Sequence, residues 1–158
     1  MNKLKILQLI IAQLSHDLNV FSTAAKTAHE AATHEQNQPD NKYDTLALEA
    51  SYVAQGQANR AQEIKQSIET YKLLNLAVDS DVIRLTSLVT IEADDGSSKT
   101  VFIGPVEGGM KITDDQIEII LITPASPLGK ALIGKRLGDY IEINAGTSRM
   151  EYEIVEIS

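Results

Sequence analysis

Hydrophobic residues recur at alternating steps of three and four along the N-terminal part of the chain. The positions that share this spacing are Leu4, Leu7, Ile11, Leu14, Leu18, Phe21, Ala25, Ala28 and Ala32. After a short polar segment a second series shows the same alternation: Ala47, Ala50, Ala54, Gln57, Ala61, Ile64, Ile68, Tyr71, Asn75 and Val78. Spacing of this kind, sustained for about four heptads, predicts two α-helices that pack along a coiled-coil seam.

The polar segment between the two series predicts a tight reversal of the chain. Pro39 lacks a backbone donor and pushes Gln38 out of the helical region, so the first helix is expected to stop here. Both series fit one antiparallel register when the chain is folded at residues 39–40. Residues 1–79 are therefore predicted to form a helical hairpin within a monomer, with an acidic tip near residues 35–44. At 1.5 Å per residue the rod would be roughly 45 Å long.

The size of the seam residues changes along the predicted hairpin. Near the tip the seam consists of alanine, and near the base it consists of large aliphatic side chains. Alanine lets helix axes approach closely, so the distal half is expected to be thin. The seam alone also fits a coiled coil that dimerises or that spaces two domains, which is how most such seams are used.

The hydrophobic pattern changes to strand-like runs over residues 80–158. The predicted strands are residues 82–91, 99–103, 116–123, 140–144 and 150–157. An Asp-Gly pair at residues 95–96 predicts a hairpin turn. Ser126 before Pro127 predicts the start of a short helix, and Gly134 predicts its end. The fold class is therefore α+β, with a small domain of antiparallel strands and one short helix after the helical hairpin.

Composition narrows the class of protein further. The 158 residues carry a formal net charge of −8, which argues against general nucleic-acid binding by a basic surface. The chain has no cysteine, which excludes disulfides, thiol catalysis and cysteine-ligated metal. No apolar run approaches membrane-spanning length, so no membrane partner is expected. We expect a cytoplasmic protein.

The most distinctive segment covers residues 123–139 and reads TPASPLGKALIGKRLGD. It resembles the hallmark of the Gre family of bacterial transcription elongation factors, Ser-Pro-(Leu/Ile)-x-x-Ala-Leu-(Ile/Leu)-Gly-Lys followed by Gly-Asp. The family's final Glu-Tyr-Glu-Ile strand has its counterpart at residues 151–154. The resemblance covers residues 80–158 and implies an FKBP-like domain there. The helical hairpin at residues 1–79 is similar to the other half of these factors.

The resemblance implies a function in regulating transcription elongation. Members dock the C-terminal domain on RNA polymerase and insert the hairpin into its secondary channel. Tip residues then help the polymerase cut backtracked RNA, so the nascent RNA 3′ end is reached only indirectly. By resemblance, Ser126, Pro127 and Leu128 are the candidate polymerase-binding residues. No enzymatic activity and no cofactor of the protein's own are implied, because the Mg²⁺ involved lies in the polymerase active centre.

The predicted tip departs from the family pattern Gly-Asp-x-x-Glu-Asn. Aligned on Asn41, the glutamate position holds Asp40, one carbon shorter, and the aspartate position holds the neutral Asn37. The resemblance makes Asp40 and Asn41 the residues that assist cleavage, with Asp40 as the ligand shared with the polymerase's Mg²⁺. Asn37 adds only a weak oxygen ligand, whereas Glu35 and Asp44 are carboxylates that can assist.

Three functions are therefore compatible with the sequence. The first is a Gre-like factor that stimulates cleavage of backtracked RNA. The second is a regulator that docks in the same way but does not cleave, because its altered tip only occupies the channel. The third is a coiled-coil adaptor or chaperone-like protein that never binds polymerase.

Overall fold

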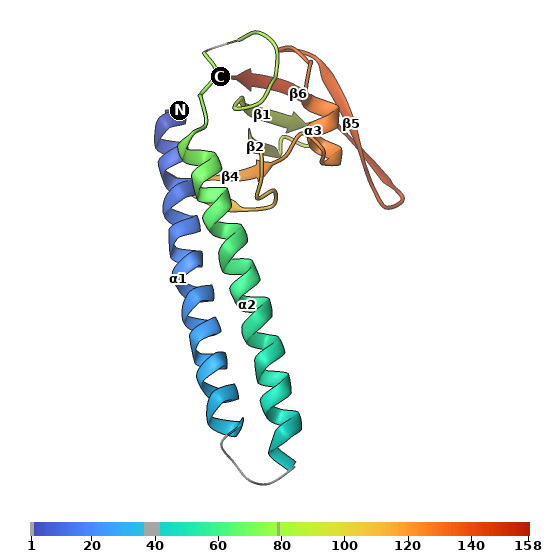
Figure 1. Ribbon diagram of the computed structural model, residues 1–158. Helices are drawn as coiled ribbons and strands as arrows, with labels where there is room; N and C mark the ends of the chain where they lie inside the picture. The colour runs from blue at the N-terminus through green and yellow to red at the C-terminus, as the bar shows by residue number, and fades with distance from the viewer. Residues whose placement is uncertain (1, 37–41, 79) are drawn as a thin grey trace. The chain divides into compact units, whose positions relative to one another are not determined.

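The computed structural model describes residues 2–36, 42–78 and 80–158, which form two compact units (Figure 1). Residues Ile11–Lys72 make up one, called the hairpin unit here. Residues Met1–Ile10 and Leu73–Ser158 make up the other, called the sheet unit. The sequence-based division between residues 79 and 80 stays a prediction. Within the described ranges, no helix is both long enough and apolar enough to cross a membrane.

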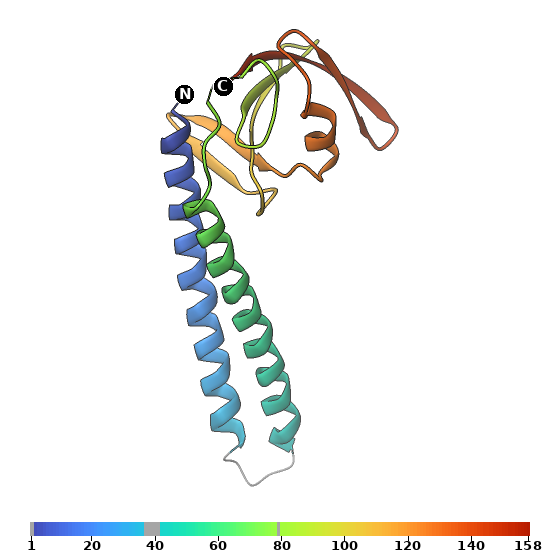
Figure 2. The ribbon, with the colours of Figure 1, turned by 45° about the horizontal axis from the view of Figure 1, so that its top comes forward.

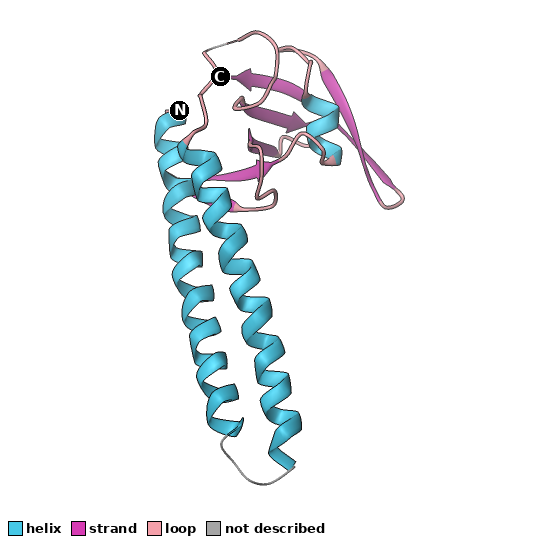
Figure 3. Cartoon of the chain, in the orientation of Figure 1, coloured by secondary structure: helices cyan, strands magenta, loops and turns pink. Residues whose placement is uncertain are grey.

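Two antiparallel helices, α1 (Lys3–Gln36) and α2 (Lys42–Lys72), are drawn in cyan in Figure 3. The hairpin unit consists of α1 from Ile11 onward and of α2. The guanidinium of Arg60 on α2 lies 6.0 Å from the centroid of the Phe21 ring on α1. An open groove of about 470 Å³ runs between the distal halves of the helices, lined by Ala25, Lys26, His29, Ser51, Ala54, Gln55 and Ala58. The predicted helical hairpin is therefore confirmed.

The seam prediction is confirmed near the base of the hairpin, except at Leu4 and at the positions beyond α2. Its buried members are Leu7, Leu14, Ala61, Ile64, Ile68 and Tyr71. Leu4, however, is 53% exposed, whereas Ile6 and Ile10, which the spacing missed, are 0% exposed. Asn75 and Val78 follow the end of α2 and belong to no helix. The spacing fails at the start of α1 because Met1–Ile10 belong to the sheet unit, so a different neighbour decides which side is buried.

The sheet unit contains one mixed sheet of six strands in the order β3-β4-β2-β1-β6-β5. The strands are β1 (Leu88–Ala93), β2 (Ser98–Ile103), β3 (Lys111–Asp114), β4 (Ile117–Ile122), β5 (Tyr140–Ala145) and β6 (Ser148–Ile157). All neighbouring pairs are antiparallel except β2 and β4, which are parallel. The α+β class is confirmed, and the expected all-antiparallel sheet is corrected by this one pair. The chain passes from β2 to the edge strand β3 and returns between them as β4.

The predicted strand 116–123 is confirmed as β4, but the strand before it, β3, was missed. Asp115 and Gln116 make the turn between β3 and β4 with φ angles of 49° and 68°. Such left-handed turns usually contain Asn or Gly, so the sequence carries no signal here. In the predicted strand 82–91, β1 begins only at Leu88, because Thr86 has a φ of 71° and breaks the extended chain.

One face of the sheet forms the main core and is covered by the short helix α3 (Pro127–Leu132), as Figure 2 shows. The buried residues of this core are Ile83, Val89, Ile91, Ala93, Val101, Ile103, Ile122, Leu132, Ile141, Tyr152 and Ile154. Leu132 comes from α3, and Leu128 and Ala131 of the same helix pack against the cluster. The helix is therefore fixed to the sheet by its apolar side.

The opposite face of the sheet is also buried over part of its width. Side chains alternate along a strand, so the residues between those of the main core point to this second face. Its buried members are Leu88, Phe102, Ile112, Ile119 and Leu121. Ile6 and Ile10, in the part of α1 that belongs to the sheet unit, are also fully buried.

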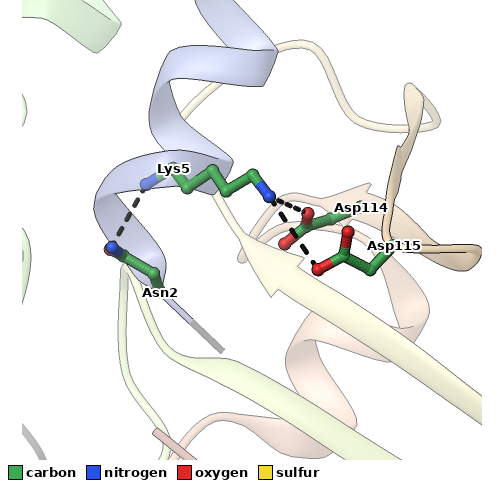
Figure 4. Close-up of polar contacts among 4 residues, drawn as sticks. All are labelled: Asn2, Lys5, Asp114 and Asp115. Carbon is green, nitrogen blue, oxygen red and sulfur yellow. Dashed lines mark hydrogen bonds and ion pairs between the residues drawn. The ribbon is translucent and has the colours of Figure 1, made fainter.

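An ion pair joins the start of α1 to the edge of the sheet (Figure 4). The Lys5 ammonium lies 2.6 Å from Asp114 Oδ1 and 3.9 Å from Asp115 Oδ2. The Asp114 side chain is 7% exposed, and Lys5 is the group that satisfies its buried oxygen. The hydrogen bond and the charge of Asp114 raise the pKa of Lys5 above its usual value. Asn2 begins the helix by accepting a 2.9 Å hydrogen bond from the Leu4 amide.

Candidate partner-binding site

The structure does not describe the side chains of the residues predicted at the hairpin tip. Asn37, Asp40 and Asn41 lie outside the described residues. Glu35 falls in the last turn of α1 and Asp44 in the first turn of α2, and neither side chain is described. In the parts of the chain that are described, no three His, Asp or Glu side chains gather as metal ligands. The roles assigned to the tip therefore stay predictions.

The predicted docking residues lie together where β4 leads into α3. Ser126 is the N-cap of the helix, with an extended backbone at φ −68° and ψ 157°. Its Oγ donates to the Thr123 carbonyl oxygen at 2.7 Å and accepts from the Gly129 amide at 3.0 Å. Pro127 takes the first helical position, where no backbone donor is required. Both side chains thus have a clear local role in starting the helix.

Of the three docking candidates, Pro127 is the one that is free to meet a partner. It is exposed, whereas Leu128 is half-buried and packs against the main core. The next residue, Gly129, is buried, and a Cβ added there would overlap the Thr123 carbonyl oxygen. The tight approach of α3 to the end of β4 therefore requires this glycine. Pro127 protrudes from a rigid corner rather than from a loose loop.

Exposed apolar and basic side chains lie on α3 and in the chain that follows it. Ile133, Leu137 and Tyr140 are 38%, 62% and 57% exposed. Gly134 and Gly138 make the intervening turns, both with a φ of 86°. The basic side chains of this stretch, which are all exposed, are Lys130, Lys135 and Arg136. In the sequence, Gly134 and Gly138 are the signal for these two tight turns, between which the side chains are presented on the surface.

Comparison with known proteins decides the family. The model described as "Transcription elongation factor, GreA/GreB, C-term" matches residues 78–158, more than half of the chain. The chain belongs to the GreA/GreB family. The resemblance found in the sequence is thereby confirmed, and the matched region includes the whole corner around Ser126 and Pro127.

Relatives match most of the chain at low identity. The transcription elongation factor GreA of Rickettsia canadensis is 27% identical over 128 residues, 81% of this chain and 74% of that protein. GreA of Thermomicrobium roseum is 25% identical over 135 residues, 84% of this chain and 80% of that protein. Among solved structures, Gfh1 of Thermus aquaticus is 23% identical, with 92% of each chain covered and a TM-score of 0.42.

Proposed function

We propose that this protein binds RNA polymerase and stimulates the polymerase's own cleavage of backtracked RNA. The single observation that carries the proposal is the family match over residues 78–158. Relatives that match most of the chain are named transcription elongation factors, which supports the same activity for the whole protein. The place of action would be the cytoplasm, where bacterial polymerase works. The protein would act as a monomer with no active site of its own.

The sheet unit would dock on the rim of the secondary channel through the corner at Pro127. An exposed proline held by a capped helix presents a fixed apolar surface, which limits the conformational entropy that this surface loses on binding. Leu128 supports this surface from below, because it packs into the main core. Ser126 keeps the corner in shape through its two hydrogen bonds.

The hairpin unit would carry the tip into the channel. Asp40 would offer a carboxylate oxygen, and Asn41 an amide, next to the polymerase's catalytic Mg²⁺. Mg²⁺ is a hard cation that prefers oxygen ligands and often takes only one or two protein carboxylates, the rest of its shell being water and substrate. Because Asn37 brings no charge, Asp40 would be the main carboxylate, with Glu35 and Asp44 as assistants.

The composition of the tip supports a second candidate function. With Asn37 and a shortened Asp40 in place of the family's Asp and Glu, the protein would occupy the channel and regulate transcription without stimulating cleavage. Docking through the sheet unit would be the same in both cases. The two candidates therefore differ only in what happens at the polymerase active centre.

The experiment that separates them uses purified polymerase stalled in a backtracked complex at fixed Mg²⁺. We expect the wild-type protein to raise the cleavage rate and Asp40→Asn, which keeps the shape but removes the charge, to abolish the increase. Binding without any increase for the wild type would establish the channel-occupying regulator. Absence of binding would overturn both candidates and favour an adaptor.

Docking has its own test in Pro127→Asn. We expect this exposed substitution to weaken binding to polymerase while the circular dichroism of the helices stays unchanged. Pro105→Asn, at a proline elsewhere on the sheet unit, is the matched control and should bind like the wild type. Leu128→Asp is not a clean test, because it would place a charge against the main core. Unchanged binding of Pro127→Asn would reassign this proline to helix formation alone.

A further inference from the structure

The chain passes between the two units twice, within α1 after Ile10 and again between Lys72 and Leu73. The second connection contains no helix or strand from Asn75 to Val78. A connection without regular structure is expected to be loose unless side chains hold its backbone. Side chains from distant parts of the sheet unit do hold it.

Ala77 is held on both sides of its peptide backbone. Its amide donates to Thr86 Oγ1 at 2.7 Å, and its carbonyl oxygen accepts from the Lys3 ammonium at 2.9 Å. The next carbonyl, of Val78, accepts from Arg84 Nη2 at 3.0 Å. Lys3 is on α1, so this set of bonds also links the second connection to the first. We call the side chains of Lys3, Arg84 and Thr86 the Ala77 clasp.

Thr86 is held in a conformation that a β-branched residue rarely adopts. Its φ is 71°, in the left-handed region, and its side chain is 1% exposed. Its amide donates to the Ile103 carbonyl at the end of β2 at 2.7 Å, and the Ser87 amide donates to the Arg84 carbonyl at 3.0 Å. These bonds fix the turn, and the fixed turn aims Thr86 Oγ1 at Ala77. A strained residue that its surroundings over-determine points to a role for that geometry.

The clasp is also joined to the corner that carries Pro127. Residue Ile83, next to Arg84, donates from its amide to the Lys135 carbonyl at 2.9 Å. The Ile83 carbonyl accepts from the Gly134 amide, also at 2.9 Å. Gly134 follows Ile133, the C-cap of α3, so one hydrogen-bonded path leads from the end of α3 through residues 83–86 to Ala77.

We propose that the Ala77 clasp fixes where the chain leaves the sheet unit for α2, and that it thereby couples docking at the Pro127 corner to the placement of the hairpin tip. This proposal rests on the proposed function. Lys3, Arg84 and Thr86 are positioning residues: they touch neither polymerase nor RNA. Loss of the clasp should leave docking intact and make the tip less effective once it is docked.

The test uses full-length Thr86→Val, which keeps the size and branching of the side chain but removes the acceptor. We expect the Ala77 amide of the free protein to exchange its hydrogen about tenfold faster, as for the loss of one hydrogen bond. In the backtracked elongation complex we expect an unchanged half-saturating concentration and a lower maximal cleavage rate. Thr86→Ser keeps the hydroxyl and should restore both readouts.

Two further variants keep the proposal falsifiable if Thr86→Val folds poorly. Lys3→Met removes the bond to the Ala77 carbonyl while keeping the aliphatic stem, and it should show the same split between saturation and maximal rate. Thr90→Val is the matched control: it removes the 3.3 Å contact of Thr90 with Thr100 inside the same sheet and should leave the maximal rate unchanged.

Each outcome has a defined meaning. Wild-type exchange at Ala77 in Thr86→Val would overturn the clasp, and so would a parallel change of half-saturation and maximal rate, because that is what simple destabilisation produces. If the wild-type protein bound polymerase but stimulated no cleavage, the readout would change. The maximal effect of the bound protein on RNA synthesis would then be measured in place of the cleavage rate. If it did not bind at all, the proposed function would fail and the coupling with it, while the exchange result would still report on Ala77.

Discussion

The hairpin unit and the sheet unit are each stabilised internally by a different kind of polar bond. Polar side-chain bonds in the hairpin unit, such as Gln13 with Asp17 and Gln55 with Asn59, join residues four apart on one helix. In the sheet unit the bond from Lys3 to Ala77 joins residues 74 apart. Local bonds form wherever a helix forms, whereas distant ones require one defined tertiary arrangement.

The buried side chains show the same contrast. The sheet unit buries large residues on two faces of its sheet, whereas the hairpin unit buries its large residues near the base and has half-buried alanines further out. In the distal half of the hairpin only the alanines of the seam are needed for the helices to pack, so the residues outside the seam can vary. We infer that docking geometry is built into the sheet unit, while the sequence near the tip can change without loss of the fold.

The largest expected difference comes from the two phenylalanines, one in each unit. Phe102 is 0% exposed on the second face of the sheet, so Phe102→Ala should lower the free energy of unfolding by about 3–5 kcal/mol. Phe21 is only half-buried, so Phe21→Ala should cost about 1–2 kcal/mol. Urea titrations with hydrogen exchange read on β2 and α1 measure both. Equal losses would contradict the contrast between the units.

A second comparison lies inside the hairpin unit. Ile64 is 0% exposed near the base, and Ile64→Ala should cost about 2–4 kcal/mol. Ala54 is half-buried in the distal seam, and Ala54→Gly should cost about 1 kcal/mol, mainly through helix propensity. Helix circular dichroism during urea unfolding reports both. A larger effect at Ala54 than at Ile64 would mean that the alanine seam, not the base, holds the helices together.

The corner at α3 is the next site to test. Ser126→Ala removes the N-cap and should lower the stability of the sheet unit by about 1 kcal/mol. Hydrogen exchange at Gly129, whose amide donates to Ser126 Oγ, should rise while exchange in α2 stays the same. Ser98→Ala, at an exposed strand position, is the control. An equal rise throughout α2 would show that the two units unfold together.

The smallest expected effect is the pH dependence of the Lys5 ion pair. The pKa of Lys5 is raised above its usual value of 10.5 by Asp114, so the folded state holds this proton more tightly than the unfolded state. The stabilisation is therefore complete below about pH 10.5 and is lost as the pH rises through the raised value. The difference in urea midpoint between wild type and Lys5→Met should shrink over that range. A constant difference for Lys5→Met would contradict the pairing.

Features of the fold that depend on residues close together in the sequence could be predicted, whereas features that depend on residues far apart could not. The helices and the cap at Ser126 follow from local spacing and capping, and both were predicted. Leu4 was wrongly placed in the seam and Ile6 missed, because the first turns of α1 belong to the sheet unit rather than to the hairpin unit. No local pattern contains that information.

The sheet shows the same limit. Strand β3 and the parallel pairing of β2 with β4 were missed because the turn at Asp115 and Gln116 contains no glycine. Thr86 reads as an ordinary strand residue, and only the folded chain places it in a left-handed turn facing Ala77. At the candidate site, Ser126, Pro127 and Leu128 were predicted as docking residues by resemblance, whereas the exposure of Pro127 and the packing of Leu128 against the core required the structure.

The division of labour between the two units is tested most directly by competition on one backtracked elongation complex. Wild-type protein is held at its half-saturating concentration, and Asp40→Ala is titrated against it while RNA cleavage is followed. We expect Asp40→Ala to compete fully and to return cleavage to the rate of polymerase alone, since the sheet unit docks without the tip carboxylate. Cleavage that stays at the wild-type level would show that Asp40→Ala cannot bind, and that the tip rather than the sheet unit carries the docking.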